Sequence, residues 1–282
     1  MAHFAPCPSL ILSIEPNDRV TFKVRHEDRD VIVADKPAGL VTQPGRGHEG
    51  DTLLNGLFAR HGVRLQQLGR DRDFGLLHRL DKQTSGLLVV ALTRDAYDAL
   101  RDAFEQRRVR KYYWAVTGKA PNKPSGVIRR PILEEGGDDS PKSSRTAPKT
   151  ARVAASGKPA LTAYRVIDAS DRGALVECRP VTGRLHQVRV HLESIGCPIL
   201  GDDLYAPRWA ASVAARLALH AHRLAFAHPR TGEAIDVRSP MPRDMKSLLK
   251  KFGLSASSDR GHQVGGDAVG HEEPGVGKPP AP

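Results

Sequence analysis

The sequence has few cysteines and no long apolar run. Its 282 residues include three cysteines, Cys7, Cys178 and Cys197, an odd number without C-x-x-C spacing. This pattern argues against a disulfide framework or a cysteine zinc site and fits a reducing compartment. The longest clean apolar stretch, 86–92, is far short of the roughly 18 residues that a membrane helix needs. The apolar patch 10–12 follows no Lys or Arg, so it is a poor signal peptide. We therefore expect a cytoplasmic protein that does not span a membrane.

The composition also lacks the biases of fibrous or disordered chains. Hydrophobic residues make up 39% of the sequence, charged residues 27% and aromatic residues 5%. These proportions exclude a collagen, a coiled coil and wholesale disorder. The length allows one large domain or two small ones, and the chain can bury a hydrophobic core.

Basic residues are in clear excess over acidic ones. Lys and Arg number 43 against 32 Asp and Glu, which gives a formal net charge of +11. A basic body attracts polyanions, and nucleic acid is the commonest polyanion in a cytoplasm. Incidental basicity of a soluble protein is the alternative, so charge alone favours nucleic-acid binding without establishing it.

Three segments are expected to lie outside the regular secondary structure. Residues 1–18 hold three prolines without a clear period and predict an N-terminal arm. Residues 134–158 contain a single large apolar residue, Val153, and predict a long polar loop. Residues 255–282 are rich in Gly and Pro and predict a disordered tail, because they cannot bury enough surface to offset the entropy of ordering. One domain is expected over 19–254.

Hydrophobic periodicity predicts more strands than helices within this domain. Helices are expected after caps at Asp51 or Thr52 and at Thr93, and over 184–195 and 245–252. Strands are expected within 20–35 and at 86–92, 112–117, 127–132, 161–167, 174–178, 219–226 and 234–237. Because strands and helices do not alternate strictly, we expect an α+β fold with a mixed, largely antiparallel central sheet flanked by helices.

Two patterns typical of nucleotide or metal sites occur in the sequence, but their context does not support such sites. The run 45–50 matches G-x-G-x-x-G, but intervening prolines separate it from the preceding strand, so a loop is favoured over a dinucleotide site. His186 and His191 are five residues apart, which does not place both on one helix face. His220 and His222 have no carboxylate or cysteine nearby at ligand spacing. No metal site and no cofactor are expected.

A carboxylate among cations marks the most unusual segment. Residues 76–88 read LLHRLDKQTSGLL, which places Asp81 in a loop between apolar runs and beside His78, Arg79 and Lys82. Positive neighbours would keep this carboxylate ionised. Two interpretations stay open on the residues alone, a catalytic aspartate and a structural one that caps a turn.

Two further segments contain candidate binding residues. Arg184 begins the helix expected over 184–195, where the helix dipole disfavours a cation unless an anion holds it, and Asp81 is a natural partner. In the run KYYWAV at 111–116, alternation puts Tyr113 and Trp114 on opposite faces of a strand. A tyrosine at this place either belongs to the core or stacks on a base.

The order of these motifs resembles a known family. The motifs are KPAGL at 36–40, HRLD with TSG at 78–86, K-x-Y at 111–113, GRLHQVRVHL at 183–192 with G-x-P-I-x-G-D-x-x-Y at 196–205, and LHA with FAHP at 219–229. Together they span about three quarters of the chain, from about residue 31 to 241. In this order they resemble the RluA-type pseudouridine synthases.

The resemblance implies a pseudouridine synthase fold with an RNA-binding cleft. It implies an isomerase that converts specific uridines of rRNA or tRNA to pseudouridine, without metal or cofactor, and 19–254 would be its catalytic domain. Asp81 matches the family's essential aspartate, which either attacks C1′ of the ribose or takes a proton from C2′. Tyr113 matches the tyrosine that packs on the target base, and Arg184 matches the arginine paired with the aspartate. Arg79 is expected to help hold the RNA.

The sequence departs from many relatives before the first motif. They carry an N-terminal S4 RNA-binding domain, whereas here the first motif begins by Lys36, which leaves no room for one. RNA selection is then expected to come from the catalytic domain, from partners and from the loop 134–158, whose charge runs from acidic to basic. A solvated insertion is the alternative for that loop. A monomer is expected.

Two other functions are weighed against this one. An inactive RNA-binding protein on the same scaffold would show damage at Asp81, Tyr113 or Arg184, and none is damaged. A glycosidase or glycosylase would need a second acid–base carboxylate near Asp81. The motifs do not distinguish rRNA from tRNA.

Overall fold

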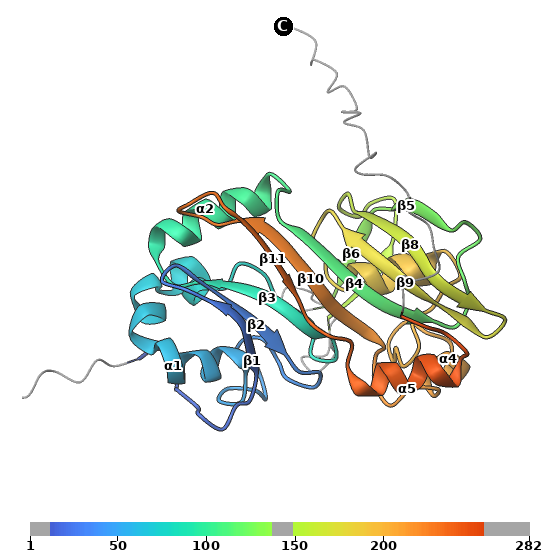
Figure 1. Cartoon of the computed structure of the whole chain (residues 1–282), viewed down its shortest axis with the longest axis horizontal. Helices are drawn as coiled ribbons and strands as arrows, with labels where there is room; N and C mark the ends of the chain where they lie inside the picture. Colours follow the sequence, from blue (N-terminus) through green and yellow to red (C-terminus); the bar gives the residue numbers. More distant parts are fainter. Residues whose placement is uncertain (1–11, 137–148, 257–282) are drawn as a thin grey trace, which may run out of the picture.

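A long mixed sheet organises the molecule (Figure 1). The computed structural model describes residues 12–136 and 149–256, and the elements below are those of the described residues. The strands are β1 Lys23–Glu27, β2 Val31–Lys36, β3 Ser85–Ala91, β4 Arg110–Thr117, β5 Ser125–Arg129, β6 Ile132–Glu135, β7 Thr150–Val153, β8 Leu161–Ser170, β9 Gly173–Pro180, β10 Leu219–Ala227 and β11 Ala234–Arg238. The helices are α1 Leu53–Leu68, α2 Arg94–Glu105, α3 Gln187–Ser194, α4 Arg208–Ala211 and α5 Arg243–Lys251, with a 3-10 segment η1 at Arg70–Gly75.

The strand order brings distant parts of the chain together. Nine strands form one sheet in the order β1-β2-β3-β10-β4-β9-β8-β5, and β11 pairs with β10. Within this sheet β10 runs parallel to β3, and the other pairs are antiparallel. The expected α+β class with a mixed, largely antiparallel sheet is confirmed.

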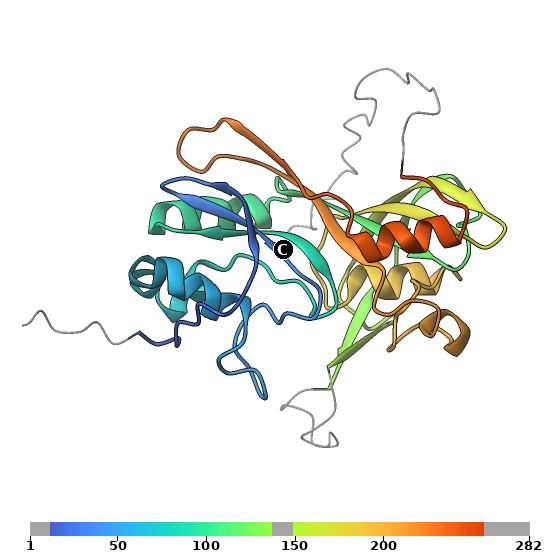
Figure 2. The same cartoon turned by 60° about the horizontal axis from the view of Figure 1, so that its bottom comes forward.

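The helices lie at the two ends of this sheet. Figure 1 shows α1 and α2 beside the β1–β3 end, and α4 and α5 at the opposite end. In the turned view of Figure 2, the β10–β11 ribbon reaches toward the α2 end of the molecule. Among the described residues, no helix has the length and apolar character needed to cross a membrane.

The first two helices begin where their caps predict. Thr52 is the N-cap of α1: its hydroxyl accepts from the backbone N–H of Asn55, whose side chain in turn accepts from the backbone N–H of Thr52. Thr93 caps α2 in the same way through the N–H of Ala96. A capping hydroxyl satisfies one of the free N–H groups of the first turn, which fixes the start of the helix.

The centre of the core is the strand that the sequence predicts at 86–92. All seven residues of β3 are buried, because β2 and β10 flank the strand and α2 packs against it. A smaller second cluster contains Ile132, Ala151, Ala160 and Val190. It joins β6 and β7 to α3, and so it positions the segment that follows β9.

The segment expected to be one polar loop, 134–158, is partly strand. Residues 150–153 pair with β6 in a two-stranded sheet, with Ile132 opposite Val153 and Glu135 opposite Thr150. Ile132 and Ala151 are buried in the second cluster, which explains why so short a pair of strands is stable here. The rest of the predicted loop, 137–148, lies outside the described residues, as do 1–11 of the predicted arm and 257–282 of the predicted tail.

Candidate active site

Asp81 lies in the loop that leads into β3, and backbone contacts hold this loop in place. The N–H of Thr84 donates to the carbonyl of Asp81 at 3.0 Å, which closes a turn. The Thr42 hydroxyl donates to the carbonyl of Leu80 at 2.8 Å. The side chain of Asp81 is 24% exposed, so its carboxylate is accessible while its backbone is fixed.

Lys36 joins this loop to the first motif. Its ammonium group is fully buried and donates to the carbonyls of Pro37, Leu40 and Lys82 at 3.0, 2.7 and 3.3 Å. Burial lowers the pKa of Lys36 to about 7, although the nearby negative charge of Asp81 opposes this shift. The lysine therefore acts as a bridge between the loop after β2 and the loop that bears Asp81.

A cavity of about 680 Å³ opens beside the carboxylate. The four residues that the sequence singles out, Asp81, Tyr113, Arg184 and Arg79, all line it. They come from the loop before β3, from β4 and from the segment after β9. The volume lies in the range of small-molecule sites, so a single nucleotide is a reasonable occupant.

The arginine beside Asp81 is Arg189, and the pairing predicted for Arg184 is wrong. A guanidinium nitrogen of Arg189 lies 3.6 Å from Asp81 Oδ2, and Nε2 of His186 lies 3.8 Å from Asp81 Oδ1. Arg184 instead donates from its Nε to the carbonyl of Pro159 at 3.2 Å. Arg184 still lines the cavity, at a different position from the one the pairing requires.

The start of α3 explains why Arg189, and not Arg184, lies beside Asp81. The helix begins at Gln187 and not at Arg184, because His186 has a left-handed backbone with a φ of 52°. The N–H of Arg184 donates to the Gln187 side chain at 3.0 Å, so Arg184 belongs to the turn before the helix. The dipole argument for Arg184 therefore does not apply, and Arg189, the third residue of the helix, faces the carboxylate.

Arg189 also binds a second carboxylate. It donates to both oxygens of Asp202, at 2.9 and 2.6 Å, and both side chains are almost fully buried. The Asp202 carboxylate also accepts from the N–H groups of Leu204 and Tyr205. Because donors already occupy both oxygens, Asp202 is a poor acid–base partner for hydrolysis.

A chain of polar contacts links Asp81 to the β6–β7 hairpin. The Tyr205 hydroxyl accepts from the N–H of Ala151 in β7 at 2.9 Å and shares a hydrogen bond of 2.6 Å with Nδ1 of His186. Nε2 of His186 faces Asp81, and a neutral imidazole can carry its single hydrogen on this nitrogen. Burial is the main cause that lowers the pKa of His186, which favours this neutral form.

His78 and Lys82 do not form the positive surroundings expected for Asp81. Nε2 of His78 accepts from the N–H of Val89 at 3.2 Å. Burial lowers the pKa of His78 to about 3, and the charge of Lys111 adds to this shift. The imidazole is therefore neutral. Lys82 lies against His48, in the glycine-rich loop, at 3.1 Å.

Tyr113 and Lys111 lie on the wall of the cavity formed by β4. Tyr113 is buried, and burial together with the charge of Asp81 raises the pKa of its hydroxyl well above the usual value. Burial lowers the pKa of Lys111 to about 8, and its ammonium lies 5.3 Å from the centre of the Phe104 ring. This wall presents an aromatic ring and a cation to whatever enters the cavity.

The residues that sequence reasoning missed lie inside motifs it had already noticed. Arg189 and His186 belong to the run GRLHQVRVHL, and Asp202 and Tyr205 belong to G-D-x-x-Y. Their spacing was visible, but the choice between two arginines depended on a left-handed residue that periodicity does not reveal.

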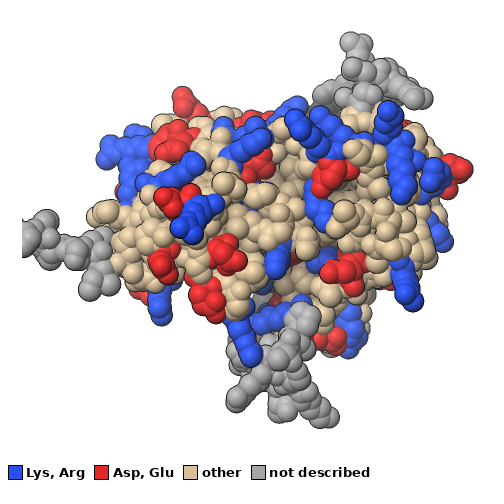
Figure 3. Space-filling model, turned by 90° about the horizontal axis from the view of Figure 1, so that it is seen from below, with Lys and Arg blue, Asp and Glu red and all other residues tan. Residues whose placement is uncertain are grey.

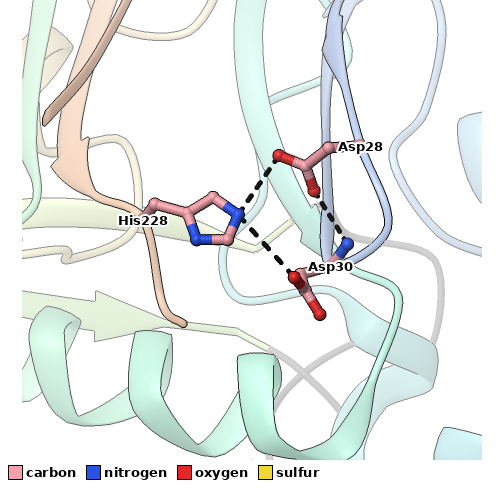
Figure 4. Close-up of side chains that lie close together, drawn as sticks. All are labelled: Asp28, Asp30 and His228. Atoms are coloured by element: carbon pink, nitrogen blue, oxygen red, sulfur yellow. Dashed lines mark hydrogen bonds and ion pairs between the residues drawn. The ribbon is translucent and has the colours of Figure 1, made fainter. Parts of the chain in front are cut away.

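A group of potential metal ligands lies away from this cavity. Figure 4 shows Asp28 and Asp30 from the β1–β2 turn facing His228, which follows β10. Nδ1 of His228 accepts from the N–H groups of Arg230 and Thr231, so its Nε2 bears the hydrogen and lies 3.2 Å from Asp28. The guanidinium of Arg230 also binds Asp30 at 2.7 Å. These hydrogen bonds account for the group as a contact between two turns.

Charge of both signs covers one face of the molecule. Figure 3 shows Lys and Arg side chains interspersed with Asp and Glu on the face seen from below. The net positive charge is therefore not gathered there in one uninterrupted patch. Which cations are available to a ligand depends on which of them lack an acidic partner.

The site is a cavity lined by several cations, with the partly exposed carboxylate of Asp81 in its wall. The chain belongs to the RNA pseudouridylate synthase family, whose model matches residues 30–194. It is 39% identical to the uncharacterized RNA pseudouridine synthase YlyB of Bacillus subtilis, over 84% of this chain and 74% of that protein. It is 42% identical to the ribosomal large subunit pseudouridine synthase D of Nitrosomonas europaea, over 83% of this chain and 66% of that protein.

Solved structures agree with this assignment. The human RNA pseudouridylate synthase domain containing 4 protein is 27% identical, with a TM-score of 0.62 over 82% of this chain and 93% of that one. The resemblance to the RluA-type synthases is thus confirmed, and the chain is an isomerase that acts on RNA. No observation favours the inactive alternative.

Proposed function

We propose that this enzyme converts uridine to pseudouridine in large-subunit ribosomal RNA, with Asp81 as the catalytic carboxylate. The observation that carries the catalytic part is the position of Asp81, partly exposed on the cavity and 3.6 Å from the buried guanidinium of Arg189. The names of relatives that are 38 to 42% identical support the RNA class, since they act on the large ribosomal subunit.

The reaction is balanced without an added reagent. The bond between C1′ and N1 of the uridine breaks, the detached uracil turns, and C5 bonds to C1′. N1 gains a proton and C5 loses one, so substrate and product have the same composition. Asp81 either attacks C1′ or removes the C2′ proton, and both routes need an ionised carboxylate. The guanidinium of Arg189 lies 3.6 Å from this carboxylate.

Neighbouring residues have separate roles in this proposal. Tyr113, buried in the cavity wall, packs against the uracil ring while it turns. Arg79 is exposed at the cavity and Arg184 is half-buried there, and neither has an ion pair with a described carboxylate. Both are placed to contact phosphates on either side of the target uridine, which must leave its helix to react.

Asp81→Asn tests the proposal directly. The variant keeps the shape of the side chain but can neither attack C1′ nor accept a proton, so we expect no measurable turnover. RNA affinity should fall by less than about tenfold, because phosphate contacts carry most of it. Release of tritium from C5-labelled uridine in transcribed large-subunit RNA measures turnover, and filter binding measures affinity.

Asp203→Asn is the matched control, since Asp203 is a 74% exposed carboxylate near the same arginine. It should retain turnover. Pseudouridine formed by the purified Asp81→Asn protein would refute the catalytic assignment. Wild-type turnover on transfer RNA transcripts but not on ribosomal RNA would refute the substrate class and leave the role of Asp81 intact.

A further inference from the structure

A second cavity, of about 310 Å³, lies at the ends of β4 and β9. Its lining contains four arginines, Arg107, Arg108, Arg110 and Arg179, and we call it the arginine groove. It shares Arg107, Pro180 and Val181 with the lining of the active-site cavity. The two spaces are therefore adjacent, with Arg107, Pro180 and Val181 between them.

The four arginines lack acidic partners. In the described part of the chain, no carboxylate lies within 4 Å of their guanidinium nitrogens, and Arg108 donates only to the neutral side chain of Gln106. Other surface arginines are paired, such as Arg72 with Asp98 and Arg216 with Asp244. Asp236 is close enough to Arg110 for the charge of that arginine to help lower the pKa of the carboxyl, but hydrogen bonds to Arg223 are the main cause of the shift. Both carboxylate oxygens of Asp236 accept from Arg223.

The backbone of Arg107 provides an independent observation. Helix α2 ends in a Schellman motif, in which the N–H of Arg107 donates to Phe104 at 3.1 Å and that of Arg108 to Ala103 at 2.8 Å. This motif requires a left-handed residue, and Arg107 adopts it with a φ of 59°. Glycine is the residue that fits this position without strain. A strained arginine at the junction of two cavities suggests that its side chain is used.

We propose that the arginine groove binds phosphates of the RNA strand that flanks the target uridine. The proposal rests on the proposed function and adds a path for the strand outside the catalytic cavity. Planar guanidinium groups without acidic partners suit phosphate, because each offers several donors in a fixed fork. Positive charge at the C-terminal end of α2 would also stabilise the helix, and the test separates that role from RNA binding.

The test compares two triple variants with the same loss of charge. The groove variant is Arg107→Gln, Arg110→Gln and Arg179→Gln. The control variant changes Arg70, Arg208 and Arg243 to Gln, three exposed arginines that have no ion pair with a described carboxylate and lie outside both cavities. Affinity for a fluorescent oligouridylate is measured from about 50 to 200 mM salt, where phosphate contacts dominate.

The groove variant should bind the oligouridylate at least about tenfold more weakly, and its slope of log K against log salt should shrink by about 2, the equivalent of three lost phosphate contacts on a single strand. On ribosomal RNA its KM should rise while kcat at saturation stays near the wild-type value. The control should keep both slope and KM. Equal losses in the two variants would show that only net charge matters, and would overturn the proposal.

Arg107→Gly separates RNA binding from helix stability. Glycine removes the backbone strain, so Tm should equal or exceed that of the wild type while oligouridylate affinity falls. Unchanged affinity with a lower Tm would assign Arg107 to the helix end and overturn its role in the groove. A wild type that binds the oligouridylate through the groove but releases no tritium would refute the proposed function alone.

Discussion

Two arginines of one motif have different surroundings, and the difference predicts different kinetic effects. Arg189 is 4% exposed, binds Asp202 through two hydrogen bonds and lies beside Asp81. Arg184 precedes the helix, and its guanidinium donates to the backbone carbonyl of Pro159. The first lies beside the carboxylate that we propose as catalytic, and the second lines the cavity that we propose to hold the RNA.

Arg189→Lys should lower kcat by about 10²-fold or more, because an ammonium cannot bind Asp202 with two parallel hydrogen bonds and also face Asp81. Arg184→Ala should instead raise KM, with kcat within about threefold of the wild type. Steady-state rates on ribosomal RNA measure both. A kcat loss in Arg184→Ala with none in Arg189→Lys would reverse the two assignments. Circular dichroism of Arg189→Lys checks that it is folded.

His78 makes stability depend on pH. Burial lowers its pKa in the folded state to about 3, against about 6.5 in an unfolded chain. Between these values the unfolded state binds more protons, so the free energy of unfolding falls as the pH drops below about 6.5. His220, whose pKa burial lowers to about 4, acts in the same direction.

His78→Gln should remove part of this acid sensitivity, because the amide oxygen can still accept from Val89 but does not titrate. From about pH 7 to pH 4.5, the wild type should lose about 2 kcal/mol more than the variant. Urea unfolding at both pH values measures the difference, and data at about pH 8 correct for any constant change in packing. If the free energy of unfolding falls equally with pH in the wild type and the variant, His78 accepts a proton without unfolding the chain.

At the scale of elements, capping residues and hydrophobic patterns predict the helices and strands whose positions depend on neighbouring residues. The capping threonines fix the starts of α1 and α2, and alternation or apolar runs locate the main strands. The start of α3 differs because the spacing of Leu185 and Val188 imitates a helix across the left-handed His186. The sequence patterns do not predict the strand at 150–153, because its partners in the second cluster lie far away in sequence.

The β6–β7 hairpin is coupled to the active site through one hydroxyl. Tyr205→Phe keeps the ring beneath Arg189, at 5.0 Å, but removes the contacts with Ala151 and His186. Losing a buried partner costs about 1–3 kcal/mol, so the Ala151 amide should exchange hydrogen at least about tenfold faster. We also expect kcat to fall, because His186 loses its fixed orientation.

Tyr112→Phe is the control for this prediction. Tyr112 is half-buried and has a cation–π contact with Arg223, and its hydroxyl has no hydrogen bond with a described residue. Exchange and kcat should match the wild type there. If Ala151 exchanges at the wild-type rate in Tyr205→Phe, the hairpin is held by its packing alone.

At the scale of the whole molecule, the sequence predicts the class of fold but not its connections. The parallel contact of β3 with β10 joins Ser85 to His220 across 135 residues, and no local sequence pattern predicts this pairing. The same holds for Lys36, which reads as a polar loop residue but is buried beneath the Asp81 loop. The four candidate residues chosen from the motifs line one cavity, whereas the contacts within it depend on this long-range arrangement.

The insertion of β10 between β3 and β4 also governs when the site can exist. Asp81 precedes β3 and Tyr113 lies on β4, so both belong to the first half of the chain. Yet the strand that holds β3 and β4 together ends at Ala227. During synthesis, a nascent chain shorter than this cannot close its sheet, and such late, non-local pairing slows folding. The enzyme therefore gains its catalytic pocket only when four fifths of it has left the ribosome.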